Sequence, residues 1–268
     1  MSFGFAFLSN DAGLLSTALV PFQGALKVQG GKHGWGLGYY QNDQPLLKKQ
    51  PKMASDDLDF CAKMQNLRTK VSIGHVRPTT AQNLTSENTE PFRYRNWLFF
   101  NCGSIPNFDS IRANLLESVP EFMRRNILGS TDSEYLFQLF LAFLNDTGNL
   151  NDPRMPCAVA GQALTVTLKF LDHLVTEQKD DRPKIGCVAT NGNVLVAVRH
   201  GVPVSIARQN SYLNVGLDIE EKPINYPHLK TVALVLGTEP QSPSGWEGIA
   251  ENIVVSVDSD LNIEYHAP

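Results

Sequence analysis

The stretch MSFGFAFL, residues 1–8, decides how the rest of the chain can be arranged. Its apolar run, residues 3–8, has the composition of a buried β-strand, and a strand that starts there fixes the position of residue 2. If the initiator methionine is removed, Ser2 carries both a hydroxyl and a free α-amine. A hydroxyl needs a base beside it to act as a nucleophile, and an α-amine with a pKa of about 8 can be that base. Ser2 is therefore either a nucleophile with its own base or an ordinary small residue in a first strand.

Composition places the chain among folded globular proteins. The 268 residues are 42% hydrophobic and 19% charged, with a net charge of −4, which predicts a packed core. The length allows one large domain or two small ones, and because no dividing linker is evident we expect a single domain over residues 1–268. Because the basic residues are thinly spread, we expect no nucleic-acid partner. No apolar run is long enough to span a bilayer and no secretion signal is evident, so we expect no membrane partner and a cytoplasmic location.

The cysteines argue against a metal centre. Their positions have no paired spacing, which favours reduced thiols over a zinc site or a disulfide framework. We therefore expect no metal and no cofactor. The four are Cys61, Cys102, Cys157 and Cys187.

Many short strands with a few helices predict an α+β sandwich. Apolar periodicity predicts helices at residues 12–22, 56–67, 108–116, 121–127, 130–143 and 155–177. Apolar or β-branched runs predict strands at residues 3–8, 33–40, 71–76, 97–100, 185–189, 194–198, 202–207, 231–236, 253–257 and 263–265. The segment TNGN, residues 190–193, is a strong hairpin signal between two of these strands.

Glycine occupies every second position from Gly34 to Gly38 in one predicted strand. Glycine weakens a strand unless another backbone or a ligand must come close. The pattern therefore fits either such a close approach or tight packing of the sheet against a helix.

A group of polar side chains follows the predicted strand at residues 71–76. His75, Arg77 and Thr80 lie where Pro78 ends regular pairing, and binding residues often lie at such junctions. An arginine there can hold a carboxylate through two parallel hydrogen bonds. The alternative is a surface arginine at a strand end.

Two further strand or helix ends carry candidate residues. Asn101, Cys102 and Gly103 follow the predicted strand at residues 97–100. Side-chain amides and backbone N–H groups at such a turn can stabilise an oxyanion, although Asn and Gly also simply favour turns. Asp132 lies at the start of a strong helix, where it can bind a ligand or cap the helix.

The order of these motifs resembles the class II glutamine amidotransferase family, in particular its compact stand-alone members similar to the γ-glutamyl hydrolase of ergothioneine synthesis. The resemblance covers nearly the whole chain. Its segments are residues 34–40, 74–80, 87–92, 97–100 and 129–134, with weaker matches at residues 197–199 and 238–240. It implies an N-terminal-nucleophile hydrolase fold, a four-layer αββα sandwich in which two antiparallel sheets lie between helical layers.

The resemblance also implies a substrate and its binding residues. The substrate would carry a γ-glutamyl amide, with glutamine as the simplest case. Arg77 would hold its α-carboxylate, Asp132 would accept hydrogen bonds from its α-ammonium, and Thr80 would place a hydroxyl in the same pocket. Because no synthase domain is evident, any ammonia-accepting synthase would be a separate partner.

The chain departs from the family at the chemistry itself. Ser2 stands where the family has cysteine, and Asn101-Cys102-Gly103 stands where the family has His-Asn-Gly. The thiol of Cys102 is a weak donor, so Gly103 N–H would remain, with Asn101 as a substitute if the strand end shifts by one residue. Cys102 as a displaced nucleophile is a further alternative, but it has no free amine beside it.

Two functional hypotheses follow from these departures. In the first, the protein hydrolyses a γ-glutamyl amide through Ser2, with Gly103 and Asn101 or Cys102 forming the oxyanion hole. In the second, it is a catalytically inactive family member that binds glutamine or a γ-glutamyl compound in a regulatory role. The sequence leaves open whether the protein is an enzyme.

Overall fold

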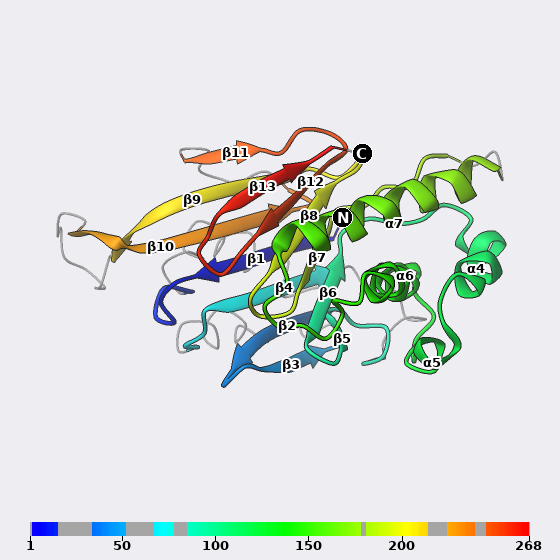
Figure 1. Cartoon of the computed structure of the whole chain (residues 1–268), viewed down its shortest axis with the longest axis horizontal. Coiled ribbons are helices and arrows are strands. Elements are labelled where there is room, and N and C mark those ends of the chain that lie inside the picture. Colours follow the sequence, from blue (N-terminus) through cyan, green and yellow to red (C-terminus); the bar gives the residue numbers. More distant parts are fainter. Residues whose placement is uncertain are drawn as a thin grey trace.

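The computed structural model describes residues 2–15, 34–51, 67–77, 85–177, 181–213, 224–238 and 245–267. Two antiparallel β-sheets lie face to face in it (Figure 1). The first sheet has, in spatial order, β11 (Trp246–Gly248), β9 (Val204–Leu213), β10 (Ile224–Leu236), β1 (Phe3–Ser9), β4 (Val71–Arg77), β2 (Gly34–Gln41) and β3 (Gln44–Gln50). The second has β13 (Ile263–His266), β12 (Ile253–Val257), β8 (Leu195–Arg199), β7 (Cys187–Thr190), β6 (Trp97–Asn101) and β5 (Phe92–Tyr94).

Helices gather on the outer side of the second sheet (Figure 1). They are α4 (Phe108–Glu117), α5 (Glu121–Arg124), α6 (Asp132–Asp146) and α7 (Cys157–Glu177). Thr131 caps α6, since its hydroxyl accepts the Glu134 N–H at 3.3 Å. The predicted α+β sandwich of two antiparallel sheets is therefore confirmed. The helices predicted at residues 56–67 and, for the most part, 12–22 lie outside the described residues.

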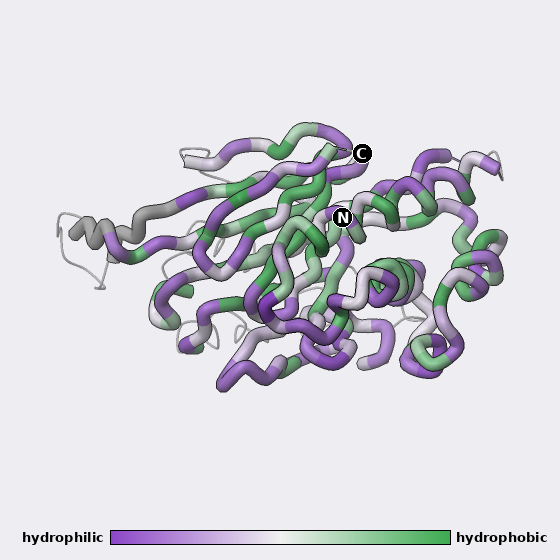
Figure 2. The backbone as a smooth tube through the Cα atoms, in the orientation of Figure 1, coloured by the Kyte–Doolittle hydropathy of each residue, from purple (hydrophilic) through white to green (hydrophobic). Residues whose placement is uncertain are grey.

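Strand β1 separates two apolar layers by the alternation of its side chains. Phe3, Phe5 and Phe7 pack on the outer face of the first sheet, whereas Ala6 and Leu8 pack between the two sheets. Figure 2 shows hydrophobic residues along the central strands and hydrophilic residues at the turns. Apolar side chains therefore cover both faces of β1, which fits its central position in the first sheet.

The glycines of β2 face the second sheet at close range. A Cβ atom on Gly36 would lie 2.0 Å from the carbonyl oxygen of Glu90, and one on Gly38 would lie 2.8 Å from Leu98 Cδ1. Of the two explanations for this glycine row, close approach of another backbone is therefore the one found at Gly36. The neighbour of Gly38 is a side chain of β6, not a helix.

Several strands differ from the prediction. The chain turns at Asn42–Asp43, both with positive φ, and β3, which was not predicted, pairs with β2 directly after this turn. Pro45 fits because β3 is an edge strand, where a missing N–H breaks no ladder bond. The short edge strands β5 and β11 were not predicted either.

Candidate functional site

The start of β1 lies against the turn that follows β6. Ser2 Oγ donates a hydrogen bond to the Cys102 carbonyl oxygen at 2.8 Å. Gly237, just after β10, closes the other side with a φ of 80°. A Cβ there would lie 2.2 Å from the Ser2 carbonyl oxygen. Residue 2 is therefore held between the ends of two strands from different sheets.

The turn after β6 is fixed largely by Asn101. Its Oδ1 accepts the N–H groups of Gly103 at 3.1 Å and Gly186 at 3.2 Å, and its Nδ2 donates to Ser133 Oγ at 3.4 Å. Gly103 itself has no room for a side chain, since a Cβ would lie 1.6 Å from the Lys184 carbonyl oxygen. The N–H expected to stabilise an oxyanion thus already donates to Asn101.

Cys102 is a buried thiol in this turn. Its Sγ lies 3.9 Å from the Leu236 carbonyl oxygen, and burial raises its pKa well above the usual value, with a further increase from the charge of Glu90. The thiolate is the nucleophilic form of cysteine. The environment of Cys102 therefore favours an inert thiol over a displaced nucleophile.

Arg77 comes opposite Ser2 when the pairing of β1 with β4 is continued. Phe3 pairs with Val76 and Gly4 with His75, so the next pair is Ser2 with Arg77. Directly opposed residues in an antiparallel pair point to the same face, and here it is the face on which the ring of His75 stacks on Phe100 of β6. The described geometry therefore brings the Arg77 position beside Ser2.

Asp132 begins α6 close to the same turn. Its Oδ2 accepts the Ile105 N–H at 2.8 Å and its Oδ1 accepts the Ser133 N–H at 2.8 Å. Burial raises the pKa of Asp132, while these N–H groups and the positive charge of Arg77 lower it by less. Oδ1 also accepts the Ser133 hydroxyl at 3.5 Å, whereas Oδ2 keeps a second lone pair for a ligand.

The predicted residues are thus brought together in part. Ser2 contacts the turn that Asn101, Cys102 and Gly103 form, and Asn101 contacts Ser133 next to Asp132. Thr80 lies outside the described residues, so its predicted place in the pocket stays a prediction.

Sequence reasoning assigned no chemistry to Glu90, which lies at the centre of this region. Glu90 Oε2 is 2.7 Å from His75 Nδ1, and both side chains are buried. Glu90 Oε1 accepts the Asn101 N–H at 3.3 Å. Burial raises the pKa of Glu90, but His75, Arg77 and Ser133 together outweigh it and lower the pKa. The available signal was an acid directly before Pro91-Phe92, within residues 87–92, one of the segments that carry the family resemblance.

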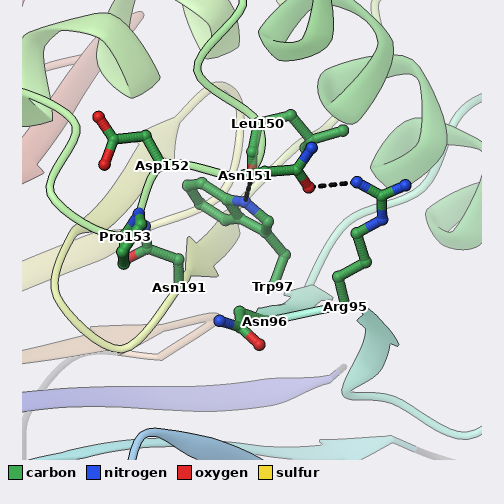
Figure 3. A pocket seen from close by; sticks show the side chains of 8 residues that line it. All are labelled: Arg95, Asn96, Trp97, Leu150, Asn151, Asp152, Pro153 and Asn191. Carbon is green, nitrogen blue, oxygen red and sulfur yellow. Dashed lines mark hydrogen bonds between the residues drawn. The ribbon is translucent and has the colours of Figure 1, made fainter.

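A separate cavity of about 220 Å³ lies at the other end of β6 (Figure 3). The indole N–H of Trp97 donates to the Leu150 carbonyl at 3.1 Å, and the Arg95 guanidinium donates to Asn151. Trp97 and Asn101 are about 13 Å apart along an extended strand. None of the predicted site residues lines this cavity.

Membrane-spanning helices and metal-binding clusters are both absent from the described residues. No helix in them is both long and apolar enough to cross a membrane. No group of three or more His, Cys, Asp or Glu side chains in the same residues could hold a metal ion.

The two stacked antiparallel sheets agree with a family assignment. The chain belongs to the class II glutamine amidotransferases, whose family model matches residues 6–261. This span begins four residues after Ser2, so it does not bear on position 2, and the single domain expected over residues 1–268 stays a prediction.

Known relatives share this family or its fold. The chain is 27% identical over 183 residues to "Probable glutamine amidotransferase DUG3" of Saccharomyces cerevisiae, an alignment that covers 62% of this chain and 51% of the relative. The chain thus spans about half the length of the curated relatives it matches.

Two solved structures share the fold at low sequence identity. A glutamine aminotransferase class-II domain protein from Silicibacter pomeroyi has a TM-score of 0.64 and 17% identity, with 99% of this chain and 98% of that chain covered. Glutamine phosphoribosylpyrophosphate amidotransferase from Bacillus subtilis has a TM-score of 0.61 and 14% identity, with 99% of this chain but 49% of that chain covered. Both comparisons show a shared fold, in which two antiparallel sheets lie face to face.

Proposed function

We propose that this protein binds glutamine or another γ-glutamyl amide and hydrolyses the amide through Ser2. The observation that supports this most is the position of the Ser2 hydroxyl, which contacts the Cys102–Gly103 turn at 2.8 Å. Arg77 lies opposite Ser2 in the strand register, and the Asp132 carboxylate is nearby. A positive and a negative side chain match the two charges of an amino-acid substrate and would fix its orientation.

The chemistry requires that Met1 be removed. The neutral α-amine of Ser2 then takes the hydroxyl proton while Oγ attacks the amide carbon. When the tetrahedral intermediate collapses, the C–N bond breaks and the leaving nitrogen receives that proton, which leaves a γ-glutamyl ester on Ser2. Water hydrolyses the ester with the same amine as base. The product leaves with a free γ-carboxylate, and the Ser2 hydroxyl is regenerated.

The oxyanion of this intermediate needs donors. Gly103 N–H is the available backbone donor in the turn, but it donates to Asn101 Oδ1 in the unliganded protein. Chemistry therefore requires that this one hydrogen bond open on substrate binding.

A second candidate function is binding without turnover. It is favoured by the engaged Gly103 N–H and by Cys102, a weak donor, at the position where the family has asparagine. In this case Arg77 and Asp132 would serve a sensor or regulatory protein. If the protein does hydrolyse the amide and the ammonia is then used in a synthesis, the acceptor site would belong to a separate synthase.

The experiment combines the intact mass of the purified protein, a glutaminase assay with a panel of γ-glutamyl amides, and calorimetric titration with glutamine. Hydrolysis predicts a mass without methionine and turnover that Ser2→Ala abolishes. Binding alone predicts no turnover but saturable binding.

Both functions predict that Arg77→Ala weakens glutamine binding about 30-fold, because a charged hydrogen-bonded contact contributes about 2 kcal/mol. Arg125→Ala is the matched control, since the Arg125 side chain is 79% exposed and pairs only with Glu121 among the ion pairs of the described residues. Unchanged binding in both Arg77→Ala and Asp132→Ala would show that the ligand binds elsewhere.

A further inference from the structure

Glu90 contacts each of the three elements that carry the candidate site. Its Oε1 accepts the N–H of Asn101 at the end of β6. Its Oε2 lies 2.7 Å from Nδ1 of His75, two residues before Arg77 on β4. Ser133, next to Asp132 at the start of α6, lies close enough to the Glu90 carboxylate to lower its pKa together with His75 and Arg77. One buried carboxylate therefore contacts or lies close to the neighbours of Gly103, Arg77 and Asp132.

The backbone of Glu90 is held as firmly as its side chain. Its carbonyl group contacts Gly36 on β2, so closely that a Cβ on Gly36 would lie 2.0 Å away. The ring of His75 is stacked on Phe100 with 5.4 Å between ring centroids. The carboxylate thus has little freedom to move, which is what a group that orients others requires.

A purely structural role does not explain a charge in this place. Burying a carboxylate beside a histidine carries a desolvation penalty that often cancels the attraction between them, and apolar residues can fill the same volume at no net cost. The charge does act on the site, because Glu90 raises the pKa of Asp132 while Arg77 lowers it.

We propose that Glu90 is a positioning residue of the γ-glutamyl site, which sets the geometry of the Asn101–Gly103 turn and of the Arg77 strand end. The inference rests on the proposed function for its ligand. It adds a residue that touches none of the reacting atoms and acts through Asn101, His75 and Ser133.

Two variants separate charge from hydrogen bonding. Glu90→Gln keeps an acceptor oxygen for the Asn101 N–H but removes the charge, whereas Glu90→Met removes both with little change in volume. Glu121→Gln is the control, because the Glu121 side chain is 81% exposed on α5. Thermal unfolding of each variant establishes that the comparison is between folded proteins.

The first measurement needs no ligand. Hydrogen exchange of the free protein is compared at the 101–105 segment and at α7. Glu90→Met should speed exchange at residues 101–105 by at least about tenfold while α7 keeps its wild-type rate. Equal acceleration of both segments, or no change at residues 101–105, would overturn the positioning role, whatever the protein binds.

The second measurement follows glutamine affinity against pH by calorimetry. In the wild type, affinity falls on acidification as Asp132 is protonated. The groups facing Asp132 are Arg77 from β4, Glu90 from the loop before β5, and the N–H groups of Ile105 and Ser133. Glu90→Gln should move this acidic limb to lower pH and weaken binding about tenfold at neutral pH.

A structural role alone would leave the position of the acidic limb unchanged. If Glu90→Gln binds glutamine as the wild type does at every pH, the proposal is wrong while the proposed function stands. If the wild type binds no γ-glutamyl compound, the proposed function fails, and the exchange measurement still decides whether Glu90 positions the turn.

Discussion

Asn101 is the side chain on which the shape of the candidate site most depends. One oxygen serves two N–H groups, from Gly103 two residues on and from Gly186 85 residues on. The local bond is the kind that asparagine forms in many turns, and it was foreseeable. The distant bond was not, because it depends on the register between β6 and β7. Both polar atoms of the Asn101 amide hold the turn in place, because Oδ1 accepts these two N–H groups and Nδ2 donates to Ser133.

The thiol of Cys102 tests whether this turn holds a nucleophile. Because burial raises its pKa, we expect Cys102 to stay unmodified when the native protein is treated with iodoacetamide at pH 8. Peptide mass spectrometry reads the modification at each cysteine, and treatment in urea provides the fully reactive reference. Rapid labelling of Cys102 in the native state would restore it as a candidate nucleophile.

Asp132 should make ligand binding sensitive to pH in the acidic range. Burial raises the pKa of Asp132 above that of a free aspartate, so on acidification its carboxylate is protonated at a higher pH than in a free aspartate. Since only the ionised form accepts an ammonium well, affinity for glutamine should fall about tenfold per pH unit below that pKa. Asp132→Asn should bind weakly at neutral pH and lose this slope. A steep acidic limb that persists in Asp132→Asn would assign the titration to another group.

At the scale of elements, the row of glycines in β2 is the feature most open to a direct test. Gly36→Ala places a methyl group against the backbone of Glu90, and overpacking of this kind costs about 1–3 kcal/mol. Urea unfolding measures the loss. Gly248→Ala is the matched control on edge strand β11, where the nearest atom to a new Cβ is 3.9 Å away. Equal stabilities of the two variants would contradict the close approach of Glu90 to β2.

The prediction of strands succeeded where apolar residues are concentrated along the sequence. Strands β1, β6 and β12 have largely apolar runs, and all three were predicted close to their observed bounds. The edge strand β3 was missed because its exposed face is polar and it contains Pro45. The same limit applies to the pair of His75 and Glu90. They come from different elements 15 residues apart, and only the stacking of the two sheets brings them into contact.

At the scale of the whole molecule, the two sheets depend on one apolar layer between them. Phe100 is fully buried in this layer and contacts both Gly4 and His75 of the first sheet. Phe100→Ala should lower the free energy of unfolding by about 3–5 kcal/mol. Urea denaturation followed by both tryptophan fluorescence and circular dichroism measures it. A loss below 1 kcal/mol would mean that the sheets are held together elsewhere.

The buried pair of Glu90 and His75 links the stability of the whole chain to acid. The folded-state pKa of Glu90 lies below its unfolded value of about 4.3. Its contribution to stability is therefore fully present above that unfolded value and is lost as the pH falls through the folded pKa. Asp132 acts in the opposite direction, because its folded pKa is raised. Urea unfolding at pH 3 to 7 should show a smaller loss of stability below about pH 4 in Glu90→Gln than in the wild type.

Because β1 lies inside the first sheet, its two neighbouring strands are synthesised at very different times. Phe5 pairs with Gly74 on one side and with Val235 on the other. At about 5–20 residues per second, the ribosome needs about 8–32 s to progress from the first of these partners to the second. Until then one edge of β1 stays unpaired, although most of the second sheet has already been made. During this interval the nascent chain therefore has an unpaired strand edge at residues 3–9, directly after the candidate nucleophile.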